Sequence, residues 1–176
     1  MPPAIRLAEL PPAAMTALLD ADLPLASAAA GIPLTGYFTT DEAKSLWAFR
    51  LAQLGSDPSH APWIVRAAVA EPDGQVVGHA GFHGAPENGT VTIAYSVDPA
   101  HRRKGYARAM LAALLERAAT EPSVTTVRAT ISPDNKASLA TIAGQGFTYI
   151  GEQWDEEDGR ELIFDRPARR SHLPAT

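Results

Sequence analysis

The stretch "TVTIAYSVDPAHRRKGYARAMLAALLERA", residues 90–118, carries a strand, a turn and a helix in direct succession. Residues 90–97 are rich in β-branched and aromatic side chains, which is typical of a strand. Asp98 and Pro99 predict a turn. From Ala107 onward, apolar residues recur at spacings of three and four, which predicts a helix with one face packed on a sheet. The stretch therefore predicts a strand-turn-helix unit.

Three consecutive cations, Arg102–Lys104, stand where this helix is expected to begin. A helix N-terminus carries roughly half a positive charge, so a basic run there is unfavourable unless an anion from outside the chain balances it. Gly105 in the first turn costs about 1 kcal/mol relative to Ala, unless a missing side chain is needed there. Amides of a helix start beside Arg and Lys suit a phosphate or pyrophosphate. The alternative is a solvated basic turn with Gly105 as packing filler.

The segments on either side predict the remaining order of elements. Three strands precede the helix, within residues 63–71, 75–84 and 90–97, and short turns join them into an antiparallel meander. A strand and two helices are expected before the meander, and a strand, a short helix and a closing hairpin after the long helix. The predicted order is β-α-α-β-β-β-α-β-α-β-β, a mixed α+β fold with a mostly antiparallel seven-stranded sheet flanked by four helices.

The totals indicate one domain and exclude several classes of function. A chain of 176 residues fits one domain, expected at residues 1–168, with a polar tail at 169–176. A net charge of −5 argues against a nucleic-acid partner, and the absence of Cys removes thiolate nucleophiles and Cys-based zinc sites. His79 and His83 share a face of their strand, where a packed pair is favoured over a two-His site, so no metal is predicted. Without an export signal or a long apolar run, we expect a cytoplasmic protein without a membrane partner.

Two motifs resemble those of the GNAT superfamily of acyl-CoA-dependent N-acetyltransferases. Residues 102–107, "RRKGYA", match the pattern (Q/R)-x-x-G-x-(G/A), whereas neither GxxxxGK[ST] nor GxGxxG occurs after a strand. Downstream, "SPDNKASLATIAGQGF" resembles the family's N-x-x-(A/S)-(x)7-G-F segment, with Asn135, Ser138, Gly146 and Phe147 at its positions. The order of elements also agrees from Ile5 to about Arg166. The closing hairpin looks most like the branch of ribosomal-protein and small-amine acetyltransferases.

The resemblance implies an acyltransferase that moves an acetyl group from acetyl-CoA to a primary amine of a small molecule or protein by direct attack in a ternary complex. It implies two strands that splay apart so that the cosubstrate's pantetheine arm lies between them. The residues that it assigns to the cosubstrate are Tyr95, Ser96, Val97, Arg102, Arg103, Lys104, Gly105, Tyr106, Ala107, Arg108, Asn135 and Ser138.

The catalytic acid and base are less well defined. Many family members carry a Tyr seven residues after the motif Asn, where this chain has Ile142, so Ser138 is the favoured acid and Tyr149 the second candidate. The strand position that often holds a Glu is Thr92. Glu87, acting through water, is therefore the candidate base.

Two other interpretations remain open at this point. Ile142 and Thr92, which replace the usual Tyr and Glu, also fit a catalytically silent CoA-binding regulatory module. A structural domain without CoA is a further alternative.

The two histidines of the strand, His79 and His83, are alternatives to Glu87 as the base. Trp154 in the closing hairpin marks a candidate surface for a homodimer.

Overall fold

The computed structural model describes residues 1–171, and in it seven strands form one sheet of order β1-β2-β3-β4-β5-β7-β6. Neighbouring strands are antiparallel except β4 and β5, which are parallel. The predicted mostly antiparallel seven-stranded sheet is therefore confirmed. The strands are β1 (Ile5–Glu9), β2 (Arg66–Ala70), β3 (Val76–Phe82), β4 (Thr90–Val97), β5 (Thr126–Ile131), β6 (Thr148–Asp155) and β7 (Gly159–Pro167).

Residues 1–171 contain five α-helices, so the prediction of four was wrong by one. The helix missed is α2, whose segment is marked by Pro and Gly and shows no clear apolar period. Asp22 begins it by accepting a hydrogen bond from the Leu25 amide at 3.1 Å, and Gly31 ends it in the left-handed conformation at φ +70°. The α-helices are α1 (Pro12–Leu19), α2 (Leu23–Ala30), α3 (Asp41–Ser56), α4 (Tyr106–Thr120) and α5 (Lys136–Ile142), and the short 3₁₀ helix η1 covers Gly36–Thr39.

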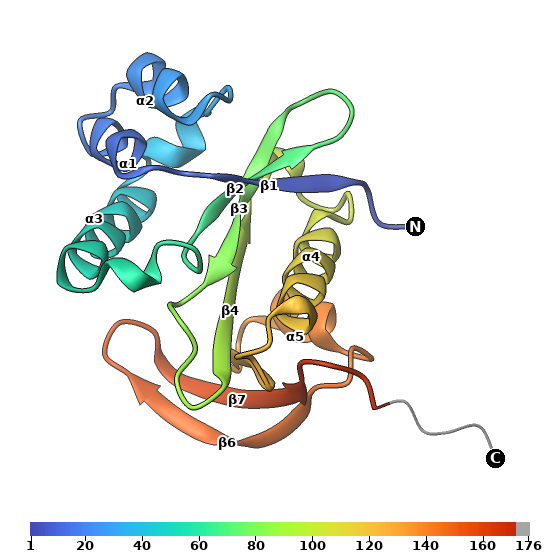
Figure 1. Ribbon diagram of the computed structural model, residues 1–176. Coiled ribbons are helices and arrows are strands. Elements are labelled where there is room, and N and C mark those ends of the chain that lie inside the picture. Colours follow the sequence, from blue (N-terminus) through green and yellow to red (C-terminus); the bar gives the residue numbers. More distant parts are fainter. Residues whose placement is uncertain (172–176) are drawn as a thin grey trace.

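The helices cover the two faces of the sheet in separate groups. Figure 1 shows α1, α2 and α3 on one side of the strands and α4 and α5 on the other. Each side has its own apolar cluster: Phe38 and Trp47 are fully buried on the first side, and Met110 and Leu114 on the second. Burial of such side chains supplies most of the driving force for the three-layer arrangement. None of the helices within the described residues is long and apolar enough to cross a membrane.

The sheet divides between β4 and β5, as the splayed strands of the prediction require. The two strands pair only at their beginnings, Thr90 with Thr126 through Thr92 with Arg128. Beyond Thr92, β4 remains paired with β3, and β5 with β7, up to the ends of the strands. The edges that β4 and β5 turn toward each other are therefore left without strand partners. We call this opening the fork.

Candidate functional site

A cavity of about 560 Å³ lies at the fork, where the end of β4, the start of α4 and α5 meet. Of the twelve residues predicted to hold the cosubstrate, all but the exposed Lys104 line it. Sequence reasoning missed three further lining residues. His101 directly precedes the basic run, and Ala137 and Thr141 belong to α5. The lining consists of Tyr95, Ser96, Val97, His101, Arg102, Arg103, Gly105, Tyr106, Ala107, Arg108, Asn135, Ala137, Ser138 and Thr141.

The start of α4 presents unpaired backbone amides to this cavity. Ala109 is the first residue whose amide reaches a helical acceptor, the Gly105 carbonyl at 3.1 Å. Within residues 1–171, no backbone acceptor is found for the amides of Tyr106, Ala107 and Arg108. Three free donors with the helix dipole behind them favour an anion.

Left-handed backbone explains Gly105 better than close packing does. Gly105 precedes the first helical residue at φ +87°, a conformation that costs an L residue roughly 1–2 kcal/mol. Arg103 also adopts a left-handed conformation, at φ +62°, although it carries a side chain. The chain therefore enters α4 through a turn with two left-handed residues, and the residues of the first helical turn line the cavity.

The turn between β4 and α4 is fixed by hydrogen bonds within it and to the adjacent strand β3. The Asp98 amide donates to the Val77 carbonyl at 2.8 Å, and the Asp98 carboxylate accepts from the Ala100 amide at 3.0 Å. The Arg102 guanidinium folds back and donates to the Val97 carbonyl at 3.3 Å. Arg103 and Arg108 are exposed at the cavity, and with Arg102 they supply the positive charge that the amides alone do not provide.

The opposite wall of the cavity is the first turn of α5. The side-chain oxygen of Asn135 caps this helix by accepting from the Ser138 amide at 3.1 Å. The Thr141 hydroxyl donates to the Ala137 carbonyl at 2.9 Å. Capping engages only the oxygen of the Asn135 amide group, so its NH₂ group is left to donate elsewhere.

The Tyr95 side chain extends from β4 toward the α4 and α5 side of the sheet, where it packs against the core. Its hydroxyl oxygen is buried and has no hydrogen-bond partner within residues 1–171. Burial raises the pKa of Tyr95 above its ordinary value, although the nearby hydroxyls of Ser138 and Thr141 lower it in part. Tyr95 therefore stays protonated at neutral pH.

The other face of β4 is tied to the helices that cover it. The hydroxyls of Tyr37, in η1, and Ser96 share a hydrogen bond. The Tyr37 ring stacks on the His79 ring, with centroids 5.8 Å apart and planes at 15°. Tyr37 was not among the predicted site residues, and its partner Ser96 could not be predicted, because the contact joins residues 59 positions apart.

The catalytic candidates from the sequence lie in different places. Ser138 lines the cavity. Glu87 is exposed in the β3–β4 turn, where its backbone pairs with Thr90, roughly 20 Å along the strand from Val97. Tyr149, on β6, is 52% exposed and donates to Glu152 at 3.2 Å, outside the cavity lining.

The two alternative bases lie on or beside β3. The rings of Tyr37, Phe38 and Trp47 surround His79. Burial, helped by the positive charge of Arg50, lowers the pKa of His79 to about 4, so that the ring is neutral near pH 7. His83 is exposed beyond the end of β3. Neither residue lines the cavity. No group of three or more His, Cys, Asp or Glu residues that could hold a metal ion occurs in the part of the chain that the structure describes.

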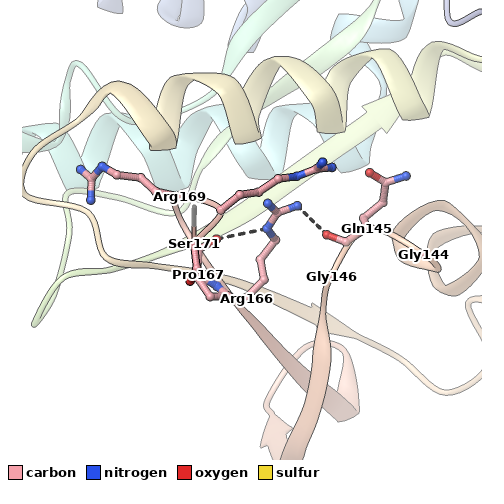
Figure 2. A pocket seen from close by; sticks show the side chains of 8 residues that line it. Gly144, Gln145, Gly146, Arg166, Pro167, Arg169 and Ser171 are labelled. Carbon is pink, nitrogen blue, oxygen red and sulfur yellow. Dashed lines mark hydrogen bonds between the residues drawn. The ribbon is translucent and has the colours of Figure 1, made fainter. Parts of the chain in front are cut away.

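A second cavity, of about 250 Å³, lies between the loop before β6 and the end of β7. Figure 2 shows the Arg166 side chain pointing toward the Gln145 carbonyl, to which it donates. Arg169 donates to the carbonyls of Val124, at 3.1 Å, and Glu121, at 2.7 Å. These guanidinium groups fasten the C-terminal end of β7 to neighbouring loops. Residues 172–176 of the predicted polar tail lie outside the described residues.

Comparison with known proteins gives one family and partial matches to relatives. The model of the "Acetyltransferase (GNAT) domain" matches residues 19–148. Over 81 residues, the chain is 38% identical to an L-2,4-diaminobutyric acid acetyltransferase of Streptomyces anulatus. This matched stretch covers 45% of this chain and 43% of the relative. The chain spans less than half the length of the curated relatives that it matches.

Solved structures are similar over nearly the whole chain. RimJ of Mycobacterium smegmatis in complex with CoA-disulfide has a TM-score of 0.63 and 23% identity, covering 98% of this chain and 85% of that one. AAC(6')-Ib in complex with ribostamycin and coenzyme A has a TM-score of 0.62 and 18% identity, covering 99% and 100%. At these identities the likeness shows the fold, and it agrees with the family match.

Proposed function

Because the chain belongs to the GNAT acetyltransferase family, we propose that it transfers an acetyl group from acetyl-CoA to the primary amine of a small molecule or protein, by direct attack in a ternary complex. The observation that carries this proposal is the cavity at the fork, lined at one end by the unpaired amides of α4. Acetyl-CoA supplies the activated thioester. The protein's own residues must bind it, orient it and manage protons.

The residues at the start of α4 fit a diphosphate. The amides of Tyr106, Ala107 and Arg108 need acceptors, and the guanidinium groups of Arg102 and Arg103 balance negative charge beside them. These groups would hold the diphosphate of the cosubstrate.

The fork itself fits an extended arm. The β4 edge beyond Thr92 has no strand partner, and the NH₂ group of Asn135 is free to donate from the opposite wall. An arm that carries amide groups would be held there by main-chain hydrogen bonds, as an added strand is. Ser138 is the sequence candidate whose position supports contact with the reacting end, whereas Glu87 and Tyr149 lie outside the cavity lining.

The binding step is tested by calorimetry with acetyl-CoA. Gly105→Glu places a side chain and a negative charge beside the free amides, so we expect at least about tenfold weaker binding. The substitution also strains the left-handed backbone, and Gly31→Glu is the matched control. Gly31 has the same conformation, φ +70°, with open space around it, at the far end of α2. Equal affinity of Gly105→Glu and the wild type would overturn the site.

Turnover is tested on a panel of amines: L-2,4-diaminobutyric acid, spermidine, ribostamycin and a peptide with N-terminal alanine. Release of free CoA is followed with a thiol reagent, and because the chain contains no Cys the enzyme adds no background. We expect acetylation of at least one amine. Tight acetyl-CoA binding without turnover on any of them would favour the catalytically silent CoA-binding module instead.

We further propose that residues 1–168 act as one domain in the cytoplasm and that the exposed side of β6 mediates a homodimer. Trp154 is 78% exposed there, and Tyr149 and Ile150 on the same strand are 52% and 51% exposed. Exposure of several large apolar side chains on an edge strand favours a partner surface. Sedimentation of the wild type and Trp154→Ser tests the assembly: we expect a dimer that the substitution weakens, and a monomeric wild type would contradict it.

A further inference from the structure

We propose that the Tyr95 hydroxyl is the group that hydrogen-bonds to the sulfur of the departing CoA and delivers the proton that it takes up. This inference rests on the proposed function, and it assigns the acid to β4 rather than to α5. It is carried by three observations: an unpaired buried hydroxyl, its place in the fork, and the chemistry of its neighbours.

The hydroxyl of Tyr95 is buried without a hydrogen-bond partner in the described part of the chain. Leaving a buried donor unpaired is unfavourable, so most buried hydroxyls in folded proteins are paired. Tyr95 lines the cavity at the fork, so a small movement of its side chain as a ligand enters would bring the buried hydroxyl to an acceptor that the ligand supplies. The acceptor that the Tyr95 hydroxyl lacks is therefore inferred to be an atom of the ligand.

The position along β4 agrees with the reacting end of the cosubstrate rather than with its phosphates. Val97 ends the strand beside the start of α4, and Tyr95 lies two residues deeper in the fork, roughly 7 Å farther from the free amides. Strand pairing between β4 and β5 closes the fork at Thr92. A ligand held by its phosphates at α4 and extended into the fork therefore passes Val97 first and then reaches Tyr95.

The neighbouring hydroxyls make Tyr95 the strongest acid of its group. Thr141 already donates to the Ala137 carbonyl at 2.9 Å. Ser138 is an aliphatic alcohol, a much weaker acid than a phenol, whose ordinary pKa is about 10. Burial raises the pKa of Tyr95, so the proton is present at neutral pH and can move only when negative charge develops beside it.

The proton balance of the step closes without another reagent. The C–N bond to the amine forms and the C–S bond breaks, and the electron pair of that bond leaves with the sulfur. The sulfur takes a proton from Tyr95, and the amine nitrogen releases one to water. The resulting phenolate regains a proton through water, so the products are an amide and a thiol, and the enzyme is unchanged.

The test is Tyr95→Phe, which removes one oxygen and keeps the ring. With the amine that the wild type acetylates, we expect kcat to fall by about 10²-fold, in the range of general acid catalysis, while the Kd of acetyl-CoA by calorimetry changes less than about threefold. The control is Thr120→Val, which removes an exposed hydroxyl at the C-terminal end of α4, outside the cavity lining, and should leave kcat unchanged. Ser138→Ala should lower kcat less than Tyr95→Phe does.

Stability measurements separate a catalytic hydroxyl from a structural one. Because the Tyr95 hydroxyl lacks a partner, Tyr95→Phe should have a Tm equal to or above that of the wild type. If kcat of Tyr95→Phe equals that of the wild type, the inference is wrong while the proposed function still stands. A lower Tm in that case would show that the hydroxyl serves the fold. A wild type that binds acetyl-CoA but acetylates no amine would overturn the proposed function, and the inference with it.

Discussion

Arg128 and Asp165 form a two-point ion pair between β5 and β7, with Nε to Oδ1 at 2.8 Å and Nη2 to Oδ2 at 2.9 Å. Arg128 is also the last residue of β5 that pairs with β4, opposite Thr92. The ion pair therefore holds β5 against β7 at the level where the fork opens. It is one reason why β5 follows β7 and leaves β4.

Replacing Arg128 should loosen the fork. We expect Arg128→Met to lower the free energy of unfolding by about 1 kcal/mol, measured by urea denaturation, because the pair is partly exposed. It should also weaken acetyl-CoA binding. Arg160→Met is the control, since it breaks the exposed Arg160–Glu152 pair in the β6–β7 hairpin, away from the cavity lining. Equal losses of affinity in both variants would contradict a role of the pair at the fork.

Replacing Arg103 should stabilise the fold and weaken acetyl-CoA binding. Its side chain sits in the left-handed conformation at φ +62°, so Arg103→Gly is expected to raise the free energy of unfolding by about 1 kcal/mol. Acetyl-CoA binding should weaken several-fold and depend less on salt, because one guanidinium near the diphosphate is lost. Calorimetry at two salt concentrations measures both effects. Arg103→Lys keeps the charge and the strain, and should therefore resemble the wild type more closely in both measurements.

Asn135 has a structural and a proposed binding role that two substitutions separate. Asn135→Asp keeps the oxygen that caps α5, so its stability should match the wild type, but it loses the NH₂ donor and adds negative charge. Acetyl-CoA affinity should fall at least about tenfold. Asn135→Ala also loses the cap, and should cost about 1 kcal/mol of stability as well. Undiminished affinity of Asn135→Asp would show that the residue only caps the helix.

Acid should destabilise the fold through His79. The pKa of His79 is about 4 in the folded protein and about 6.5 when unfolded, so below pH 6.5 the unfolded chain binds more protons. The contribution of the neutral ring is complete above pH 6.5 and is lost progressively as the pH falls to about 4, amounting to about 1–3 kcal/mol. Tm measured against pH should show this slope. His79→Phe keeps an aromatic ring and should reduce this slope, and His83, whose pKa is also lowered to about 4, would account for part of the slope that remains. An unchanged slope in His79→Phe would assign the whole effect to other groups.

The fold could be predicted largely because its signals are local. The short turns between the strands, the basic turn and the period of α4 each lie within a few residues, and they predicted the order of strands. The place where the sheet divides was implied by the family resemblance and not by these local signals. The helix α2 escaped because its eight residues are mostly Ala, Leu and Pro without a polar face. Contacts between α1 and α2, rather than a sequence period, hold it in place.

The site divides in the same way between local and distant relationships. The motif residues around Gly105 and Asn135 could be grouped because both segments resemble motifs of one family, and Thr141 could have been added, since it lies one helical turn from Ser138. Tyr95 was predicted to contact the cosubstrate, but the role of its side chain was not predicted. The sequence of a strand does not show whether a tyrosine hydroxyl finds a hydrogen-bond partner. That property depends on Ser138 and Thr141, which are more than forty positions away in the chain.

The unpaired edges at the fork have an evolutionary consequence. If the arm of the cosubstrate is held by main-chain groups of β4 beyond Thr92, its recognition is independent of the side chains on that strand. Mutations at Tyr95 or Ser96 could then change the chemistry or the acceptor while the donor molecule stays the same. Such a site can diversify its reactions by single substitutions without first having to regain its cosubstrate.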